Sequence, residues 1–284
     1  MPSLIDIRRR IRSVKNTQQI TKAMKMVSAA KLRRAQDRVI AARPYVATLR
    51  KVLANVAAAA AADEQAGANP LMARRPEQRI LLVLITSDKG LAGAFNANLI
   101  RGAQRFAAER PEAAVTMELV GRKGRDFFRK RGARISGETI NIAKPTYEAT
   151  TPISGKAMEM YRKGEADSVY LLYNEFKSVI AQKLVLTRVL PVTLAEGAAP
   201  VDYIFEQPPA EMLEALLPRY VEMEFFRALL ETAAAEHAAR MTAMDAATSN
   251  AAEMIEKLTL FMNRVRQASI TKEIIEVVSG AAAE

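Results

Sequence analysis

Cysteine is absent from the 284 residues of this chain, and histidine occurs once, as His237. The first absence excludes disulfides, thiol nucleophiles and thiolate metal ligands, and the second excludes a metal centre built from several histidines. Long apolar runs are also missing. The longest, at residues 56–62 and 80–86, fall far short of the roughly 20 residues that span a bilayer, so we expect no membrane-spanning helix. The chain starts Met-Pro-Ser-Leu without an apolar secretory stretch, so we expect no signal peptide.

Charge is distributed unevenly along the chain. The formal net charge is +11, yet residues 1–51 carry 14 Lys and Arg against two acidic residues, whereas residues 210–284 carry 7 against 12. The basic N-terminal segment fits a nucleic acid, an anionic membrane surface or an acidic protein partner, and charge alone does not choose among them. With 50% hydrophobic and 26% charged residues, the chain has enough apolar side chains for one large or two modest folded domains.

Glycine, which interrupts helices, is absent from residues 1–66 and 198–279, and eleven of the twelve glycines lie between these segments. Apolar residues recur at spacings of three and four in both segments, which indicates long amphipathic helices with a coiled-coil seam. The first seam contains Leu4, Ile7, Ile11, Val14, Leu32, Ala35, Val39, Ala42, Val46, Leu49, Leu53 and Val56. The second contains Leu213, Leu217, Val221, Phe225, Leu229, Thr232, Ala251, Ile255, Leu258, Met262 and Val265. Pro44 lies inside the first seam and should bend the helix or loosen one turn.

Helices over residues 3–60 and 210–278 would be about 85 and 100 Å long at 1.5 Å per residue, so we expect them to project beyond any globular body. Each helix needs a partner to bury its seam. Because the first helix is basic and the second acidic, their charges are complementary and they can pair with each other. We therefore predict an intramolecular antiparallel coiled coil. The alternative is a compact helical bundle, but the stripes are narrow and rich in alanine, which favours a thin rod.

The middle of the chain has the pattern of an α/β domain. Residues 79–86, 115–120, 168–173 and 179–189 are predicted strands, and residues 95–108, 122–131 and 153–163 are predicted helices. We expect a small, mostly parallel sheet with helices on its faces. The predicted organisation is an N-terminal coiled-coil helix at 1–62, a linker at 63–77, a central α/β domain at 78–206 and a C-terminal coiled-coil helix at 207–284.

Two features resemble parts of an active site, but neither has the residues that an active site would need. The turn at residues 86–93 joins a strand to a helix, but it has only two glycines and lacks both the Gly-x-Gly-x-x-Gly spacing and a Gly-Lys-Ser/Thr sequence. A structural or partner-contacting turn fits better than a nucleotide site. His237 has neither a neighbouring serine nucleophile nor a second histidine, so we expect it at the edge of the seam or on the surface rather than as a catalytic base.

Several long runs of the sequence resemble the gamma subunit of the F-type ATP synthase, and the likeness extends from end to end. The matching runs are IDIRRRI at 5–11, VKNTQQITKAMKMV at 14–27, SDKGLAG at 87–93, ARMTAMDAA at 239–247, NRVRQASITKE at 263–273 and SGAAA at 279–283. Glu284 departs from the family's usual apolar last residue. Ala92 stands where many members have cysteine, and the chain has no inserted cysteine pair, so a chloroplast-type thiol switch is excluded.

The resemblance implies a rotor and not a catalyst. Its coiled coil would stand inside a hexamer of alpha and beta subunits, one copy per complex, and its central Rossmann-like α/β domain would lie beside the epsilon subunit and the c ring. Proton flow would turn the ring and the shaft, which would drive each beta subunit through open, loose and tight states. No cofactor or metal is implied. The start at Met1 without a transit peptide suggests a bacterial protein on the cytoplasmic face of the inner membrane, with a mature mitochondrial form as the alternative.

The resemblance also assigns candidate partner contacts. The residues matching beta-subunit contacts are Arg266, Gln267, Arg240, Met24 and Lys89. Of these, Arg266 and Gln267 match positions that hydrogen-bond a loop of beta, and Lys89 matches a basic residue that faces an acidic helix-turn-helix tip of beta. Tyr203 and Glu206 fall where the family's foot approaches the c ring and epsilon.

Two other classes of function, nucleic-acid binding and nucleotide-dependent catalysis, fit the sequence less well. A coiled coil that binds nucleic acid would use the basic arm, but residues 1–51 contain only Tyr45 as an aromatic side chain for base stacking. A nucleotide-dependent enzyme built on the central domain would need a phosphate-binding loop, which the sequence lacks.

Overall fold

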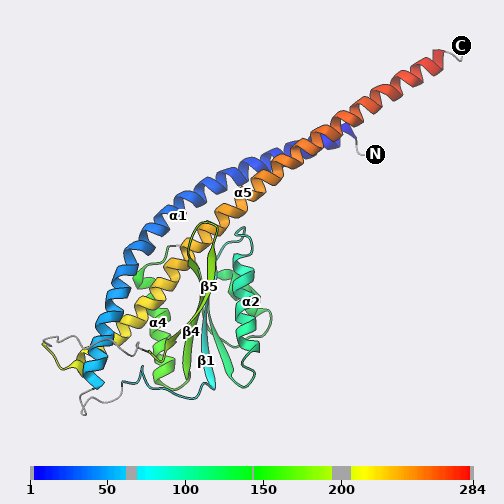
Figure 1. The fold of residues 1–284 in the computed structure, drawn as a ribbon. Helices are drawn as coiled ribbons and strands as arrows, with labels where there is room; N and C mark the ends of the chain where they lie inside the picture. Colours follow the sequence, from blue (N-terminus) through cyan, green and yellow to red (C-terminus); the bar gives the residue numbers. More distant parts are fainter. Residues whose placement is uncertain (1–2, 62–68, 143, 194–205, 282–284) are drawn as a thin grey trace. The chain divides into compact units, whose positions relative to one another are not determined.

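The computed structural model describes residues 3–61, 69–142, 144–193 and 206–281 (Figure 1). Its two longest elements are the helices α1 (Leu4–Ala61) and α5 (Pro209–Ala281), which occupy the two ends of the chain as predicted. Both helices continue through an internal proline, Pro44 in α1 and Pro218 in α5. No helix in the described ranges is both long and apolar enough to cross a membrane.

The first turn of α1 is closed by a reciprocal cap. The Asp6 amide donates to the Ser3 hydroxyl oxygen at 3.2 Å, while the Ser3 amide and hydroxyl donate to Asp6 Oδ2 at 3.3 and 2.7 Å. This arrangement satisfies donors that the first helical turn leaves without a partner, and it places a carboxylate at the positive end of the helix dipole. The cap formed by Ser3 and Asp6 therefore explains why the helix begins at Leu4.

The structure divides into two compact units, and both helices contribute to each. One unit contains α1 up to Ala29 and α5 from Arg240 onward, and the other contains the chain between them. In the first unit, Thr21 Oγ1 lies 2.8 Å from Thr248 Oγ1, and Lys25 Nζ lies 2.5 Å from Asp245 Oδ1. Moving forward along α1 therefore means moving backward along α5, which confirms the antiparallel pairing.

The second unit keeps this orientation. Arg43 pairs with Glu231 and Arg50 pairs with Glu224, so seven residues forward on α1 correspond to seven residues backward on α5. Seam residues of both helices are buried in one core, among them Leu49, Leu53, Val56, Leu213, Leu217, Val221, Phe225 and Leu229. The predicted seam and the predicted pairing are both present, and a bundle of short helices is excluded.

A five-stranded sheet lies in the second unit, with the strand order β3-β2-β1-β4-β5. The strands are β1 (Arg79–Ile85), β2 (Ala114–Val120), β3 (Ile135–Thr139), β4 (Ser168–Phe176) and β5 (Gln182–Leu190). The first four are parallel, and β5 pairs antiparallel with β4. β1 is buried from its second residue to its last, because a central parallel strand is covered on both faces, and its sequence is accordingly a continuous apolar run.

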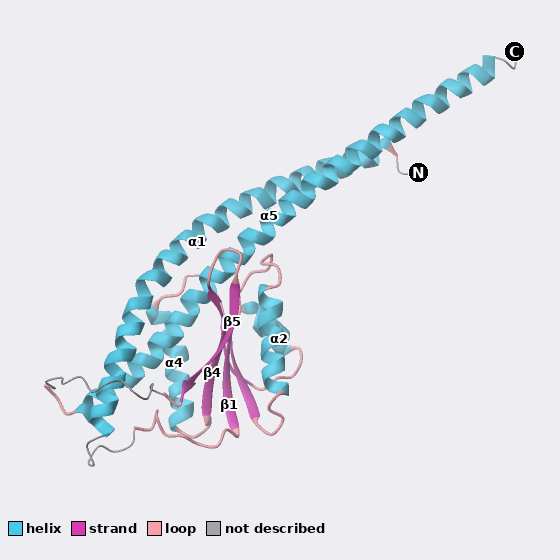
Figure 2. Ribbon diagram, viewed as in Figure 1, coloured by secondary structure: helices cyan, strands magenta, loops and turns pink. Residues whose placement is uncertain are grey.

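Helices cover both faces of this sheet, as Figure 2 shows. On one face, α4 (Tyr147–Arg162) shares a core with α1 and α5. On the other, α2 (Phe95–Ala108) and α3 (Arg122–Arg129) pack against the sheet. α2 buries one stripe at helical spacing, Phe95, Leu99, Ala103 and Phe106. The α/β fold predicted for the centre of the chain is therefore confirmed.

The structure corrects the sequence analysis at three elements. β3 was missed, because its Ser136, Gly137 and Glu138 hide the alternation that marks a strand. α4 begins at Tyr147, ahead of the predicted residue 153, because the Thr146 hydroxyl accepts the Ala149 amide at 3.3 Å and caps the helix. The last strand begins at Gln182 rather than residue 179, since the preceding residues form the turn from β4.

Replacement of Gly121 by alanine is predicted to disrupt the junction of β2 and α3. Gly121 has φ of 93°, and a Cβ atom there would lie 2.2 Å from the Thr86 carbonyl oxygen. We expect Gly121→Ala to lower the free energy of unfolding by more than about 2 kcal/mol, from backbone strain and overlap together. Gly155→Ala is the matched control, because a Cβ there meets nothing within 4 Å in the middle of α4. We expect it to be stabilising by about 0.5–1 kcal/mol, and urea unfolding of both variants checks the contrast.

Asp167 joins the starts of β1 and β4, and its contribution should depend on pH. Its carboxylate accepts the Arg79 amide at 2.8 Å and the Arg79 guanidinium at 2.8 and 3.2 Å. Burial raises the pKa of Asp167, but the hydrogen bonds from Arg79 outweigh it and hold the pKa below its ordinary value. A lowered pKa stabilises the fold above the ordinary value and loses this effect as the pH falls through the lowered one. We expect Asp167→Asn to melt below the parent protein at pH 7 and the gap to close below about pH 4. A gap of constant size from pH 7 to pH 3 would contradict this.

Candidate functional site

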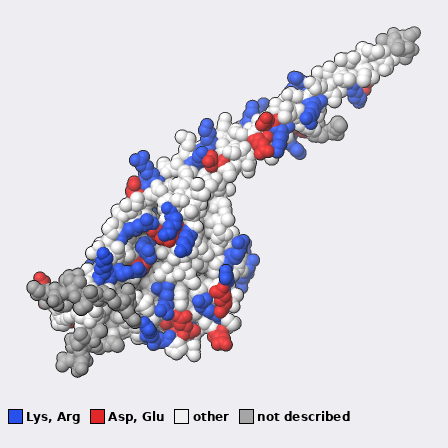
Figure 3. All heavy atoms as spheres, viewed as in Figure 1, with Lys and Arg blue, Asp and Glu red and all other residues white. Residues whose placement is uncertain are grey.

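The C-terminal half of α5 is an exposed surface with many apolar side chains. Arg266 and Gln267, the two predicted contacts for a beta-subunit loop, are adjacent and exposed there. The exposed large apolar residues around and beyond them are Met254, Leu260, Phe261, Ile270, Ile274, Ile275, Val277 and Val278. In Figure 3 this end of the helix shows few charged side chains. Exposed apolar surface of this extent is typical of a segment that another protein covers.

The other two predicted contacts on the helices lie elsewhere. Met24 on α1 is half-buried, and Arg240 on α5 is only 8% exposed. Arg240 and Arg266 are 26 residues apart on one helix, which corresponds to about 39 Å at 1.5 Å per residue. The four predicted residues therefore do not form one cluster, and any contacts they make with partners are separate contacts along the helices.

The turn between β1 and α2 holds Lys89 in a fixed, exposed position. The Ser87 hydroxyl donates to the Lys89 carbonyl oxygen at 2.6 Å, and the Asn96 side chain accepts the Ser87 amide at 3.0 Å. The same turn is tied to the start of α3, where the Arg122 amide donates to Asp88 Oδ1 at 3.0 Å. The Ser87 amide, the Lys89 carbonyl and the Asp88 carboxylate are thus used within the protein. The exposed Lys89 and Arg122 give this end of the sheet a positive charge.

Of the two residues predicted at the foot, Glu206 is exposed and lies shortly before α5, while Tyr203 lies outside the described residues. His237 is half-buried on α5, as expected for a residue at the seam edge. No group of three His, Asp or Glu side chains suited to a metal ion occurs in the part of the chain that the structure describes.

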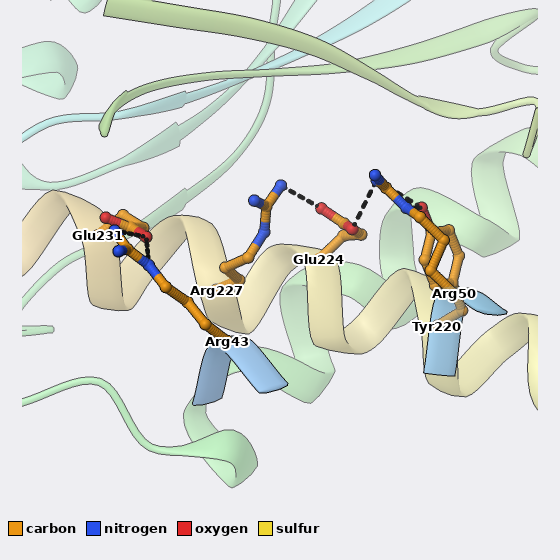
Figure 4. Close-up of polar contacts among 6 residues, drawn as sticks. All are labelled: Arg43, Arg50, Tyr220, Glu224, Arg227 and Glu231. Atoms are coloured by element: carbon orange, nitrogen blue, oxygen red, sulfur yellow. Dashed lines mark hydrogen bonds and ion pairs between the residues drawn. The ribbon is translucent and has the colours of Figure 1, made fainter. Parts of the chain in front are cut away.

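Two buried carboxylates on α5, which the sequence analysis did not single out, organise the polar contacts between α1, α5 and the sheet (Figure 4). Glu231 is 1% exposed, and its Oε1 accepts Arg43 Nη2 at 2.9 Å and Arg43 Nε at 3.1 Å. Its other oxygen accepts the Phe176 amide at the end of β4, at 3.0 Å. Arg43 Nη2 also donates to the Phe176 carbonyl oxygen at 3.2 Å. One carboxylate therefore joins α1, α5 and β4.

Glu224 lies one heptad earlier on α5 and is 2% exposed. It accepts Arg227 Nη2 at 2.6 Å within the helix and Arg50 Nη2 at 3.3 Å from α1. Arg50 also donates to the Tyr220 hydroxyl at 3.2 and 3.3 Å. The hydrogen bond with Tyr220 raises the pKa of Arg50, and the negative charge of Glu224 acts in the same direction. Burial lowers the pKa of Arg227, but Glu224 outweighs it, so its pKa is also raised. Each of these carboxylates therefore has a fully charged partner.

These features define a subunit of a larger assembly: a two-helix coiled coil with exposed apolar side chains on α5, joined to an α/β domain by a shared apolar core and by the buried carboxylate of Glu231. A family model described as ATP synthase matches residues 3–283. The chain is 75% identical to the ATP synthase gamma chain of Solibacter usitatus (strain Ellin6076) over 284 residues, which cover 100% of this chain and 99% of that one. It is 52% identical to the ATP synthase gamma chain of Anaeromyxobacter sp. (strain Fw109-5), over 100% and 99% of the two chains.

The chain belongs to the gamma-chain family of the F-type ATP synthase. Among solved structures it is similar to a chain of the Tetrahymena thermophila mitochondrial ATP synthase central stalk and c ring. The TM-score is 0.61 at 26% identity, with 80% of this chain and 99% of that one covered. A chain of the Euglena gracilis mitochondrial ATP synthase rotor, 21% identical, has a TM-score of 0.68 over 94% and 98% of the two chains, which shows the shared fold.

Two cross-helix ion pairs are predicted to differ strongly in their effect on stability. Arg43→Ala leaves the buried carboxylate of Glu231 without its charged partner, and we expect a loss of about 2 kcal/mol, less than for a fully buried pair because Arg43 is half exposed. Lys25→Ala removes an ion pair whose two side chains are 41% and 56% exposed, and we expect a loss of less than about 1 kcal/mol. Urea unfolding of both variants at moderate salt checks the contrast. Equal losses would mean that burial of Glu231 does not govern the difference.

Proposed function

We propose that this chain is the central rotor shaft of an ATP synthase and has no catalytic role of its own. The observation that carries the proposal is the antiparallel coiled coil whose C-terminal segment exposes apolar side chains, in a chain that matches its relatives over its full length. In this proposal the segment beyond Ala251 is covered by a ring of alternating alpha and beta subunits. The α/β domain, beside the epsilon subunit, receives the rotation of the c ring.

The physical basis of coupling would be differential binding. The exposed surface of α5 is not uniform, because charged and polar side chains, Arg266 and Gln267 among them, alternate with exposed apolar ones. A shaft with unequal sides binds the open, loose and tight states of a beta subunit differently at each angle. Rotation then shifts the populations of those states, which leads to ATP synthesis, and hydrolysis reverses the sequence. In this way the chain would regulate both catalytic activity and proton flow.

Specific contacts follow from the exposed positions. Arg266 and Gln267 would hydrogen-bond a loop of beta, and Lys89, held at the end of the sheet, would face an acidic tip of beta. Met24, which is half-buried, and Arg240, which is 8% exposed, would make separate contacts with beta farther from the C-terminal end of α5.

The opposite end of the assembly would involve the segment before α5. Tyr203 and Glu206 would approach the c ring and the epsilon subunit, and Glu206 is exposed as such a contact requires. We place one copy of the chain in each complex, peripheral to the cytoplasmic face of a bacterial inner membrane. The proposal assigns it no cofactor.

Reconstitution tests this function. The purified chain is mixed with cognate alpha and beta subunits, and the complex is isolated and assayed for ATP hydrolysis. We expect one copy for every three alpha and three beta subunits, and we expect Arg266→Ala and Gln267→Ala to lower turnover by removing hydrogen bonds to beta. Arg105→Ala is the control, since it removes an exposed positive charge from α2, where its partner is Glu109 of the same helix.

Failure of well-folded subunits to form the complex would overturn the rotor proposal. Assembly with full turnover in the Arg266 and Gln267 variants would instead remove only the assignment of these two residues. A defect of equal size in Arg105→Ala would show that turnover responds to any loss of positive charge, and the assignment of Arg266 and Gln267 would fail.

A further inference from the structure

We infer that Glu231 is the positioning residue of a mechanical junction that holds the α/β domain rigidly to the coiled coil. The inference rests on the proposed rotor function. A domain that receives rotation from a ring must transfer torque to the helices, and the contacts between them then limit how stiff the rotor is. The relevant contacts all lie within one compact unit of the structure.

Glu231 joins three segments that are far apart in sequence. Its two oxygens divide between α1, through Arg43, and the end of β4, through the Phe176 amide. Because Arg43 also binds the Phe176 carbonyl oxygen, both backbone polar groups of Phe176 are fixed by this one ion pair. β4 lies beside the central strand β1, so the junction reaches the middle of the sheet and not a peripheral loop.

Glu224 provides a second attachment between α1 and α5, through Arg50, one heptad away. Seven residues separate Arg43 from Arg50 on α1, and seven separate Glu224 from Glu231 on α5. One attachment point leaves a pair of packed elements free to pivot, whereas two points along the helix axis oppose both pivoting and sliding. Figure 4 shows the two ion pairs following each other along α5.

The chemistry of these contacts suits resistance to torque better than apolar packing does. The surrounding core is rich in aliphatic side chains, whose attraction is nearly independent of direction and changes little when elements slide by a fraction of a turn. Hydrogen bonds to a buried carboxylate depend on distance and angle, and breaking them leaves an uncompensated charge away from water. Apolar residues of similar volume would stabilise this core equally well. The presence of two buried carboxylates therefore indicates a role in fixing the register of the packed elements.

The test uses the complete ATP synthase in sealed vesicles, with ATP hydrolysis and ATP-driven proton pumping measured on the same preparation. For Glu231→Gln we expect hydrolysis close to that of the parent complex and pumping against a preformed proton gradient reduced at least about twofold, because the weakened junction slips under load. Glu159→Gln is the matched control, since it makes the same change in an exposed pair with Lys163 on α4. It should leave both measurements unchanged.

Cross-linking separates a mechanical role from a folding role. Because the chain has no cysteine, Arg43→Cys with Glu231→Cys introduces its only two thiols. In a complex whose other subunits lack accessible thiols, we expect this double variant to pump poorly and a short bifunctional thiol reagent to restore pumping. Melting temperatures of the variants are recorded alongside.

The outcomes are distinguishable. If hydrolysis and pumping fall together in Glu231→Gln, or if both stay at the parent level under load, the junction is overturned. If pumping falls but the cross-link does not restore it, the two side chains serve folding and the junction is likewise overturned. If the unmodified chain fails to support ATP-driven pumping at all, the rotor function itself fails, whatever the variants do.

Discussion

The structure depends on the mutual burial of two helices that could not be stable alone. α1 and α5 are 58 and 73 residues long, and both carry an apolar seam at heptad spacing. A single helix of this kind exposes its seam along its whole length, and only a partner with the same spacing removes that surface from water. Everything else follows from this pairing, because the sheet is inserted in the chain between the two helices and packs against them where their seams meet.

Charge gives this pairing a direction. In each of three ion pairs between the helices, the basic residue belongs to α1 and the acidic residue to α5: Lys25 with Asp245, Arg43 with Glu231 and Arg50 with Glu224. The uneven charge of the sequence therefore appears in the structure as cross-helix complementarity. Such complementarity selects orientation and register more than it adds stability, particularly for the exposed pair. The two pairs with buried carboxylates combine selection with rigidity, because Glu231 also accepts the Phe176 amide of the sheet and Arg50 also donates to Tyr220.

The helices and the parallel sheet could be predicted from the sequence, because glycine distribution and heptad spacing are long-range patterns. β3 could not, since three of its five residues are Ser136, Gly137 and Glu138. The surface residues of the candidate site came from resemblance, and the fold confirms only that Arg266, Gln267 and Lys89 are exposed. Glu231 was missed because a glutamate in a helix is usually solvated. Its position between Leu230 and Thr232, both buried, is the signal that could have found it.

The separation of the paired helices in sequence also has a consequence for synthesis on the ribosome. Thr21 can contact Thr248 only after another 227 residues have been synthesised. At 5–20 residues per second, about 11–45 s pass between their emergence. During this interval the basic N-terminal helix has an unsatisfied seam, while the α/β domain can already form its parallel core. Newly made chains are therefore exposed to aggregation and to premature association for tens of seconds, and the acidic C-terminal helix ends this exposure when it arrives.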